Sequence, residues 1–574
     1  MSDVAVAGVP GQTPLPVTGP TLVTSRHRPF AHIVSVEGGQ ALAAFDTRGS
    51  LSETSDDERV EIGSIVTITT PASQIIGVVT GVSVPMGSYE VGEAATRLME
   101  LDLVGEIIGN IADRSFKRGV TALPALGDAI ARASHQDLDL IYSTRKRPSV
   151  TIGNLYQDRE IPATVIVDEL LGKHFAVVGS TGAGKSCGVA AILHSIIGNY
   201  PEARIVVLDV HNEYAAAFRG QAELVSPANL QLPFWLLSFD ELASVFTTFD
   251  EHQSDDLEIL HDAVLYAKKR YFDTGGRQNS LLKKSVDAAV SVGAGIGGAI
   301  SVDAPSPFRL QDVAGYIDEQ LGKLERTQSL VSLRRMKLRI DTLTTDVRYA
   351  FMFGQITIQD KMAEILSRLF RIPSAGKPVT ILDLSAVPSE ILNVVISVIC
   401  RMAFDLGVWS KGQLPITLIC EEAHRYAPQD RAAGFEPTRR SLARIAKEGR
   451  KYGISLGVIT QRPSELDATL LSQCSTIFAH RLSNEADQRT VRSRSADCAV
   501  SLLDFLSSLG DGEAIVVGQG VAMPMRIRFS RLPVEKQPAS QSAQFSKFWQ
   551  SSVMNLEDVE KVVARWRYNR RDDE

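Results

Sequence analysis

The residues whose chemistry is most specific form the sequence G-x-x-x-x-G-K-S at positions 179–186. It follows the apolar stretch FAVVG and precedes the helical stretch CGVAAILHSII, which is the strand-to-helix context of a phosphate-binding loop. Glycines let backbone N–H groups turn around phosphate oxygens, and the N-terminus of the next helix favours negative charge. We therefore predict that Lys185 reaches the β- and γ-phosphates of ATP and that the Ser186 hydroxyl binds Mg²⁺. The predicted nucleotide-contacting residues of this loop are Gly179, Ser180, Thr181, Gly182, Ala183, Gly184, Lys185, Ser186 and Cys187.

A second group of reactive side chains is the acid pair Glu421 and Glu422, which follows the apolar stretch ITLIC. At the carboxyl end of a parallel strand, such acids face the crevice where ligands bind in open α/β sheets. We predict that Glu421 holds Mg²⁺ through water, and that Glu422 orients and polarises the water that attacks the γ-phosphate. A solvated acidic strand end is the alternative, and the complete phosphate loop upstream favours the catalytic interpretation.

Polar residues follow two further apolar stretches. Asp209 and Glu213 come just after ARIVVL, where they either support metal or water or cap their own loop. Gln461 comes just after GISLGVIT. We interpret Gln461 as a sensor that hydrogen-bonds the γ-phosphate or the attacking water, and an ordinary polar turn residue is the alternative.

Basic residues are concentrated between Arg431 and Lys451, where seven of them face only two acids. Such a segment supplies an arginine finger to a neighbouring subunit, contacts DNA phosphates, or forms a solvated helix face. A guanidinium stabilises charge on a transferring phosphoryl group. We predict Arg450, in the GRKYG turn, as the finger and Arg444 as the second choice.

The elements that must position these residues alternate between apolar strands and helical or loop segments. This alternation predicts an α/β fold with a mostly parallel, doubly wound sheet. Between the strands, residues 239–374 show helical spacing and a loose Gly-rich segment, and we interpret them as a helical insertion. The insertion divides the ATPase core into residues 151–238 and 375–535. The expected strands are HFAVVG, ARIVVLDV, KPVTILDLS, PITLICEEAH, GISLGVIT and QCSTIFAHR.

The flanking segments have other patterns. Residues 1–26 are rich in Pro, Gly, Thr and Val without periodicity and predict a disordered N-terminus. Residues 27–150 alternate short β-type runs with turns and predict a small β-barrel or sandwich, interpreted as a structural collar. Residues 536–574 predict a single amphipathic C-terminal helix that ends in charges.

Composition limits the class of protein. The chain has 574 residues, of which 44% are apolar and 22% charged, as in soluble globular proteins of several domains. The net charge of −7 argues against a surface coated with cations but leaves room for a local DNA-binding surface. Five scattered cysteines favour a reducing compartment, and no export signal or membrane span is evident, so we expect a cytoplasmic protein without membrane insertion.

Five stretches of the chain, taken in order, resemble the HerA ATPases, which are hexameric DNA translocases related to the FtsK motors. These stretches are HFAVVGSTGAGKS, LDVHNEY, CEEAHRYAP, IAKEGRKYGISLGVITQRPSELD and LGDGEAIVVG. The resemblance covers roughly residues 151–528, and the predicted N-terminal barrel also matches that family. The phosphate loop alone would identify only a P-loop protein.

The resemblance implies a RecA-like core in a homo-hexamer, with double-stranded DNA in the channel and ATP at the subunit interfaces. It implies that Lys173 contacts nucleotide across an interface and that the terminal helix braces adjacent subunits. It also implies a nuclease or sirtuin-like effector partner, as in bacterial antiphage defence or DNA-end processing. The sequence itself has no nuclease motif that we find.

Two other classes remain as alternatives. A conjugation- or secretion-type motor shares the same core, and a ring that binds ATP mainly to scaffold an effector would carry the same motifs. A GTPase is disfavoured because no N-K-x-D sequence is present, and a transporter ATPase because no LSGGQ-like signature is present.

Overall fold

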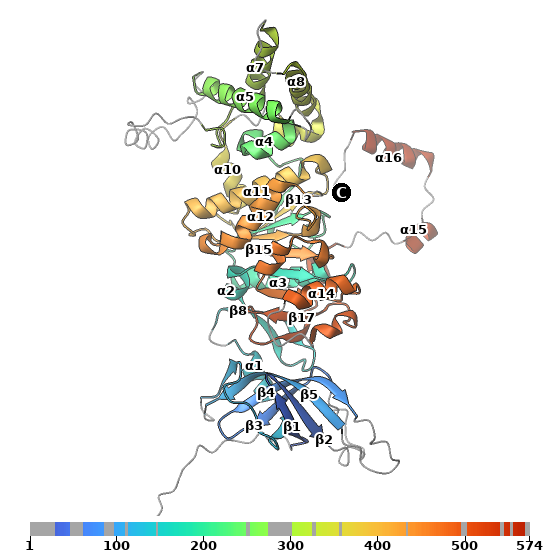
Figure 1. Cartoon of the computed structure of the whole chain (residues 1–574). Coiled ribbons are helices and arrows are strands. Elements are labelled where there is room, and N and C mark those ends of the chain that lie inside the picture. Colours follow the sequence, from blue (N-terminus) through green and yellow to red (C-terminus); the bar gives the residue numbers. More distant parts are fainter. Residues whose placement is uncertain are drawn as a thin grey trace, which may run out of the picture.

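The computed structural model places a β-barrel, the α/β domain of the expected motor (called the motor domain below) and a helical bundle in a row, with two C-terminal helices to one side (Figure 1). The predicted disordered segment 1–26 lies outside the described residues. The structure describes residues 29–45, 61–84, 97–109, 113–144, 147–247, 253–273, 301–323, 329–354, 359–431, 434–494, 502–539, 545–551 and 555–568.

The N-terminal barrel closes because β2 pairs with β5 as well as with β1. Six strands follow one another around it in the order β2-β1-β7-β3-β4-β5, and β6 extends the sheet beyond β5. Inward side chains such as Ile33, Val66, Ile75 and Leu101 form its separate core. The barrel strands are β1 (Ala31–Glu37), β2 (Gln40–Phe45), β3 (Ile65–Thr69), β4 (Gln74–Ser83), β5 (Arg97–Ile108), β6 (Ser115–Arg118) and β7 (Ala129–Arg132).

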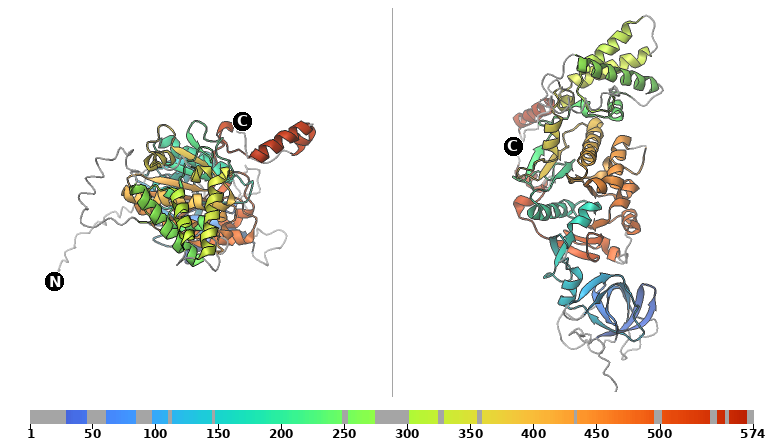
Figure 2. Two further views of the ribbon diagram at one scale, coloured as in Figure 1. Left: turned by 90° about the horizontal axis from the view of Figure 1, so that it is seen from above. Right: turned by 90° about the vertical axis from the view of Figure 1, so that its left-hand side faces the viewer.

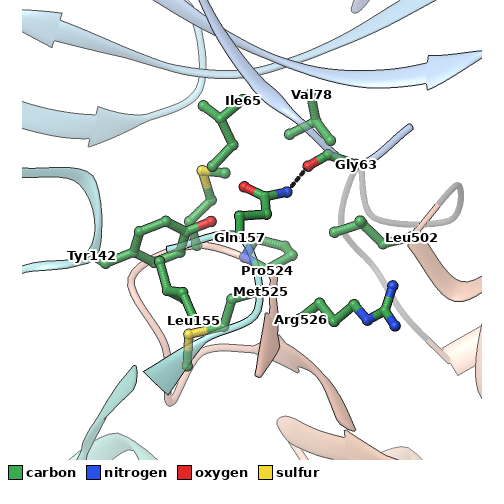
Figure 3. A pocket seen from close by; sticks show the side chains of 11 residues that line it. Gly63, Ile65, Val78, Tyr142, Leu155, Gln157, Leu502, Pro524, Met525 and Arg526 are labelled. Carbon is green, nitrogen blue, oxygen red and sulfur yellow. Dashed lines mark hydrogen bonds between the residues drawn. The ribbon is translucent and has the colours of Figure 1, made fainter. Parts of the chain in front are cut away.

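The joint between barrel and motor is an apolar contact completed by hydrogen bonds from side chains to backbone carbonyls, one of which is drawn in Figure 3. Ile65 and Val78 of the barrel meet Tyr142 at the end of α1 (His135–Tyr142) and Leu155 of the motor sheet. The amide of Gln157 donates to the carbonyl of Gly63 across the joint. Arg118 of the barrel also contacts the motor. Its guanidinium donates to three backbone carbonyl groups at the end of β17 and in the turn that follows, those of Gly518, Val521 and Ala522.

The motor domain is built on an 11-stranded sheet with the order β12-β13-β11-β14-β15-β10-β16-β17-β18-β8-β9. The strands from β12 to β16 are parallel, and the remaining four pair antiparallel. The predicted α/β fold with a parallel-rich sheet is therefore confirmed, and the six expected strands are β10, β11, β13, β14, β15 and β16. The parallel strand β12 and the antiparallel strands β8, β9, β17 and β18 are additions that the sequence prediction did not include. The motor strands are β8 (Ser149–Leu155), β9 (Pro162–Ile166), β10 (Phe175–Val178), β11 (Ile205–Asp209), β12 (Ala222–Val225), β13 (Val379–Asp383), β14 (Ile416–Cys420), β15 (Ile454–Thr460), β16 (Thr476–Ala479), β17 (Glu513–Gly518) and β18 (Met525–Phe529).

Helices cover both faces of this sheet (Figure 2). Among the described helices, α11 is the one long and apolar enough to cross a membrane, and 67% of its most apolar window is buried inside the protein. That burial is what a core helix of the motor domain requires. The principal motor helices are α2 (Val167–Gly172), α3 (Lys185–Asn199), α11 (Ser389–Trp409), α12 (Glu436–Glu448), α13 (Ala468–Gln473) and α14 (Glu485–Arg494).

The insertion between β12 and β13 is helical and forms the end of the molecule opposite the barrel (Figure 1). Buried Ile259, Ile317 and Met336 pack between its long helices. Glu241, itself buried, accepts from Arg401 of α11 at 2.9 Å and so ties the insertion to the motor. The insertion helices are α4 (Phe239–Phe246), α5 (Gln253–Asp273), α7 (Leu310–Gly322), α8 (Leu330–Thr345), α9 (Ala350–Phe353) and α10 (Met362–Leu369).

The C-terminal segment contains two helices, α15 (Phe545–Ser551) and α16 (Leu556–Tyr568), so the prediction of a single helix is wrong. A new helix begins at α16 because Asn555 and Asp558 exchange reciprocal hydrogen bonds of 3.0 and 3.2 Å at its N-terminus. This is a capping box, which satisfies two otherwise unpaired N–H groups of a helix start. Both helices project from the body of the protein (Figures 1 and 2).

Candidate nucleotide site

The phosphate loop connects β10 to α3, as predicted, at the carboxyl edge of the parallel strands. Gly184 has a φ of 97°, and a Cβ there would lie 3.0 Å from the backbone nitrogen of Gly512, so this position requires glycine. The Lys185 ammonium donates to the carbonyl of Ser180 at 3.2 Å, across the loop. Burial lowers the pKa of Lys185, and nearby carboxylates, that of Glu422 foremost, oppose this shift.

Several carboxylates surround the first turn of α3. The Ser186 hydroxyl donates to Glu213 at 2.6 Å, and the carboxyl of Glu421 lies close to those of Glu213 and Asp209. Burial, with these neighbouring acids, raises the pKa of Glu421 to about 10. One oxygen of Glu421 and one of Glu422 are buried without a hydrogen-bond partner.

This cluster fits the predicted Mg²⁺. Buried carboxylates without partners are costly, and a divalent cation relieves both their repulsion and their unsatisfied oxygens. Ser186 and Glu421 are the residues that would hold the ion, with Glu213 beside them. When bound, Mg²⁺ neutralises charge on the β- and γ-phosphate oxygens.

The structure separates the roles of Asp209 and Glu213, which the sequence left as a pair. Asp209 accepts from the backbone N–H groups of His211, Glu213 and Tyr214 at 2.9–3.2 Å. It therefore caps its own loop, which was the structural alternative. Glu213 faces Ser186 instead and stays a candidate for the metal site.

Glu422 has a backbone conformation that favours glycine, with a φ of 46°. Such an outlier costs free energy and occurs most often at functional sites, where surrounding contacts fix it. The backbone N–H of Arg425 donates to the Glu422 carbonyl at 2.9 Å and holds the turn that follows β14. The carboxylate is buried and faces Lys185, so its placement suits the predicted role in activating water.

The tip of β15 meets the phosphate loop. The hydroxyl of Thr181 donates to the side-chain oxygen of Gln461 at 2.5 Å. The structure thus brings together the phosphate loop, the acid pair and the predicted sensor, from three parallel strands. Because β14, β15 and β10 are neighbours in the sheet, their carboxyl ends open into one crevice.

Two histidines at the site were not predicted. His480 is fully buried beneath the phosphate loop, where a Cβ on Gly179 would lie 2.6 Å from its own Cβ. Burial lowers the pKa of His480 to about 4, so the ring is neutral at pH 7. His424 lies beside Glu422 and Thr460. Both histidines lie in stretches that the sequence analysis quotes, His424 in CEEAHRYAP and His480 in QCSTIFAHR, but no role was predicted for either of them.

The predicted trans-acting cations lie at the other edge of the sheet. Lys173 precedes β10 and Arg450 precedes β15, whereas the phosphate loop and Gln461 follow the same strands. At about 3.3 Å per residue, the four residues of β10 alone separate Lys173 from the phosphate loop by roughly 13 Å. Arg450 is exposed in the turn η8 (Gly449–Tyr452). The structure therefore does not bring either cation to the phosphate loop of its own chain.

The second candidate for the finger, Arg444, is engaged within its own subunit. Its guanidinium stacks 4.2 Å from the ring centroid of Phe404 and lies 3.9 Å from Asp405. A cation held by an aromatic face and a carboxylate has less freedom to reach a neighbour. These contacts favour Arg450 over Arg444.

The surroundings of Lys173 are cationic. It lines a cavity of about 550 Å³ at the joint of barrel and motor, together with Arg114, Arg118 and Arg147. Lys173 also pairs with Glu169 at 2.5 Å. The positive charge at this edge of the sheet favours contact with an anion supplied from outside the subunit.

Comparison with known proteins identifies proteins that are similar to this chain. Residues 150–403 match the family model for the central domain of helicase HerA. The DNA double-strand break repair helicase HerA of Pyrococcus furiosus is 27% identical over 443 residues, which cover 70% of this chain and 72% of that protein. The DNA double-strand break repair helicase HerA of Sulfurisphaera tokodaii is 22% identical, covering 88% of this chain and 95% of that protein.

A solved structure, that of VirB4 of Thermoanaerobacter pseudethanolicus, is similar with a TM-score of 0.48 and 14% identity. The similarity covers 68% of this chain and 98% of that one.

Proposed function

Because this chain is an ATPase of the HerA family, we propose that it works as a hexameric ring of the bacterial type that moves double-stranded DNA through its channel. It is a DNA-translocating ATPase motor that uses ATP and Mg²⁺. We further propose that the ring is cytoplasmic and acts with a nuclease or sirtuin-like effector, in DNA-end processing or antiphage defence.

The positions of the site residues at opposite edges of the sheet support the proposed ring. The phosphate loop, the acid pair and Gln461 lie at the carboxyl edge of the parallel sheet, and Lys173 and Arg450 lie at the amino edge. A subunit therefore cannot apply its own Arg450 to its own nucleotide. A closed, head-to-tail ring juxtaposes these two different surfaces of adjacent subunits and completes every site.

Within the site, each side chain has a separate task. Lys185 holds the β- and γ-phosphates, and the Glu422 carboxylate orients and polarises the attacking water. Gln461 contacts the γ-phosphate or that water from the tip of β15. The in-line displacement transfers the γ-phosphoryl group to water and releases ADP, and charge on its equatorial oxygens is stabilised by the cations around it.

The projecting C-terminal helices support assembly through their exposed apolar side chains. Trp549 and Trp566 are 80% and 81% exposed, and Phe545, Leu556 and Val559 are exposed as well. Burying a large apolar side chain contributes roughly 1.5–3 kcal/mol, so these residues favour contact with a neighbouring subunit.

We expect truncation after Ser540 to weaken the ring, so that it dissociates at a higher protein concentration than the full chain. Light scattering and native mass measurement during dilution check this. A control chain that ends at Tyr568 loses only the charged residues NRRDDE and should assemble normally. If the chain truncated after Ser540 stays assembled on dilution as well as the full chain does, the C-terminal helices do not stabilise the ring. A monomeric full-length chain would refute the ring itself.

The test of the motor is the ATPase rate with and without linear duplex DNA, with the presumed effector titrated in. We expect linear duplex to raise the rate several-fold. A scaffold that binds ATP mainly to hold an effector would hydrolyse little and would gain nothing from DNA. An unchanged low rate in the presence of both DNA and effector would therefore favour the scaffold over the translocase.

A further inference from the structure

A small polar contact links the predicted catalytic acid to the neighbouring strand. The Nδ1 atom of His424 lies 3.1 Å from the hydroxyl oxygen of Thr460 and 3.3 Å from Oε2 of Glu422. The first distance is a hydrogen bond. The second is outside hydrogen-bond geometry, so Oε2 is buried without a hydrogen-bond partner in the described part of the chain. The two side chains, His424 and Glu422, are each 10% exposed.

Thr460 connects this contact to the phosphate loop. It is the last residue of β15, fully buried, and its hydroxyl also accepts from the backbone N–H of Arg462 at 3.0 Å. The bond from Arg462 closes a turn around Gln461, and the bond with His424 holds the Thr460 side chain. Gln461 in turn accepts from Thr181 of the phosphate loop. A continuous series of contacts therefore runs from the phosphate loop through Gln461 and Thr460 to His424.

Glu422 needs an external constraint. Its carboxylate sits on a flexible side chain, and water activation requires the reacting atoms within about 3–3.5 Å of each other. The turn after β14 fixes its backbone, but nothing in that turn fixes Oε2. Among the described side chains, the His424 ring is placed to contact both this oxygen and the tip of β15.

We propose that His424 is a positioning residue that couples Glu422 to the tip of β15, so that Glu422 is aligned for water activation when Gln461 engages the γ-phosphate. His424 does not touch the substrate. Its Nδ1 bonds Thr460, and a small rotation of the ring or of Glu422 completes the contact with Oε2. The proposal rests on the assignment of Glu422 as the residue that activates water.

The first test compares two substitutions of similar size. In His424→Asn the side-chain amide occupies the position of Nδ1, and in His424→Gln it occupies the position of Nε2. We expect His424→Asn to retain most of kcat and His424→Gln to lose about 10²-fold, the cost of a misplacement of about 1 Å. KM for ATP should change little in both. Arg425→Gln, at the exposed neighbouring position, is the control and should match the parent.

The second test addresses the partner hydroxyl. Thr460→Val removes the hydroxyl with little change of volume and should lower kcat as His424→Gln does, whereas Thr460→Ser should retain it. The double variant His424→Gln/Thr460→Val should be no slower than either single variant, because both act through one contact.

Other results would overturn the coupling. Equal kcat for His424→Asn and His424→Gln would show that the position of the Nδ1 atom is irrelevant, and additive losses in the double variant would show that the two residues act separately. A change confined to KM would make His424 a nucleotide contact. The Glu422→Gln variant gives the kcat that is expected when the water-activating carboxylate is lost altogether. If that variant hydrolyses normally, the assignment of Glu422 fails independently of the result for His424.

Discussion

Lys185→Ala is expected to abolish ATP hydrolysis, with a loss on the order of 10³-fold or more. The ammonium group is buried at the start of α3 and donates across the phosphate loop. Removing it takes away the charge that holds the β- and γ-phosphates, and alanine leaves no donor in its place. Phosphate release from purified, assembled protein measures the effect. Turnover near that of the parent would refute the phosphate-loop assignment.

Glu422→Gln supplies the contrast to that result. Glutamine keeps the shape of the side chain and leaves the metal site intact but cannot polarise water as a carboxylate does. We expect the variant to bind ATP and to retain it unhydrolysed, whereas Lys185→Ala also weakens binding. If Glu422→Gln hydrolyses normally and Glu421→Gln does not, the two acids have exchanged roles.

The parallel core was predictable because its strands are buried on both faces. The runs FAVV, IVVLD and ITLIC are almost wholly apolar, which is the pattern of parallel strands covered by helices. The strand β12 was missed because it has only four residues, AELV, and two of them are not buried. The break between α15 and α16 was missed because amphipathic spacing continues through it, and only the capping residues mark the new start.

The functional residues of the candidate site were predictable where they lie together in one short sequence motif. The phosphate loop and the acid pair are each a run of consecutive residues, so the residue types within each run identify it. His424 and Thr460 are 36 residues apart, and their contact exists only because β14 and β15 are adjacent in the sheet. Asp209 and Glu213 show the same limit. Their spacing fits a metal site, but the backbone turn directs Asp209 to three N–H groups.

Arg450→Ala is expected to suppress turnover far more than ATP affinity, because Arg450 completes the site of an adjacent subunit. Lys185 and Mg²⁺ serve one side of the triphosphate, and the γ-phosphoryl oxygens need a cation on the open side. An arginine finger contributes about 10³–10⁵ in rate. Arg450 is exposed at the amino edge of the sheet, roughly the length of β15 from Gln461. Lys451→Ala, in the same exposed turn, is the control and should retain activity.

Mixing two inactive variants tests action across the interface. Subunits with Arg450→Ala keep an intact phosphate loop, and subunits with Lys185→Ala keep an intact finger. A mixed ring places both intact halves together at some interfaces, so ATPase activity should recover. Absence of recovery in rings shown to contain both variants would contradict completion of each site by a single neighbouring Arg450 and would mean that the ring fires only when all of its sites are intact. Full activity of Arg450→Ala alone would move the finger to Arg444, which must then leave Phe404 and Asp405 to reach a neighbour.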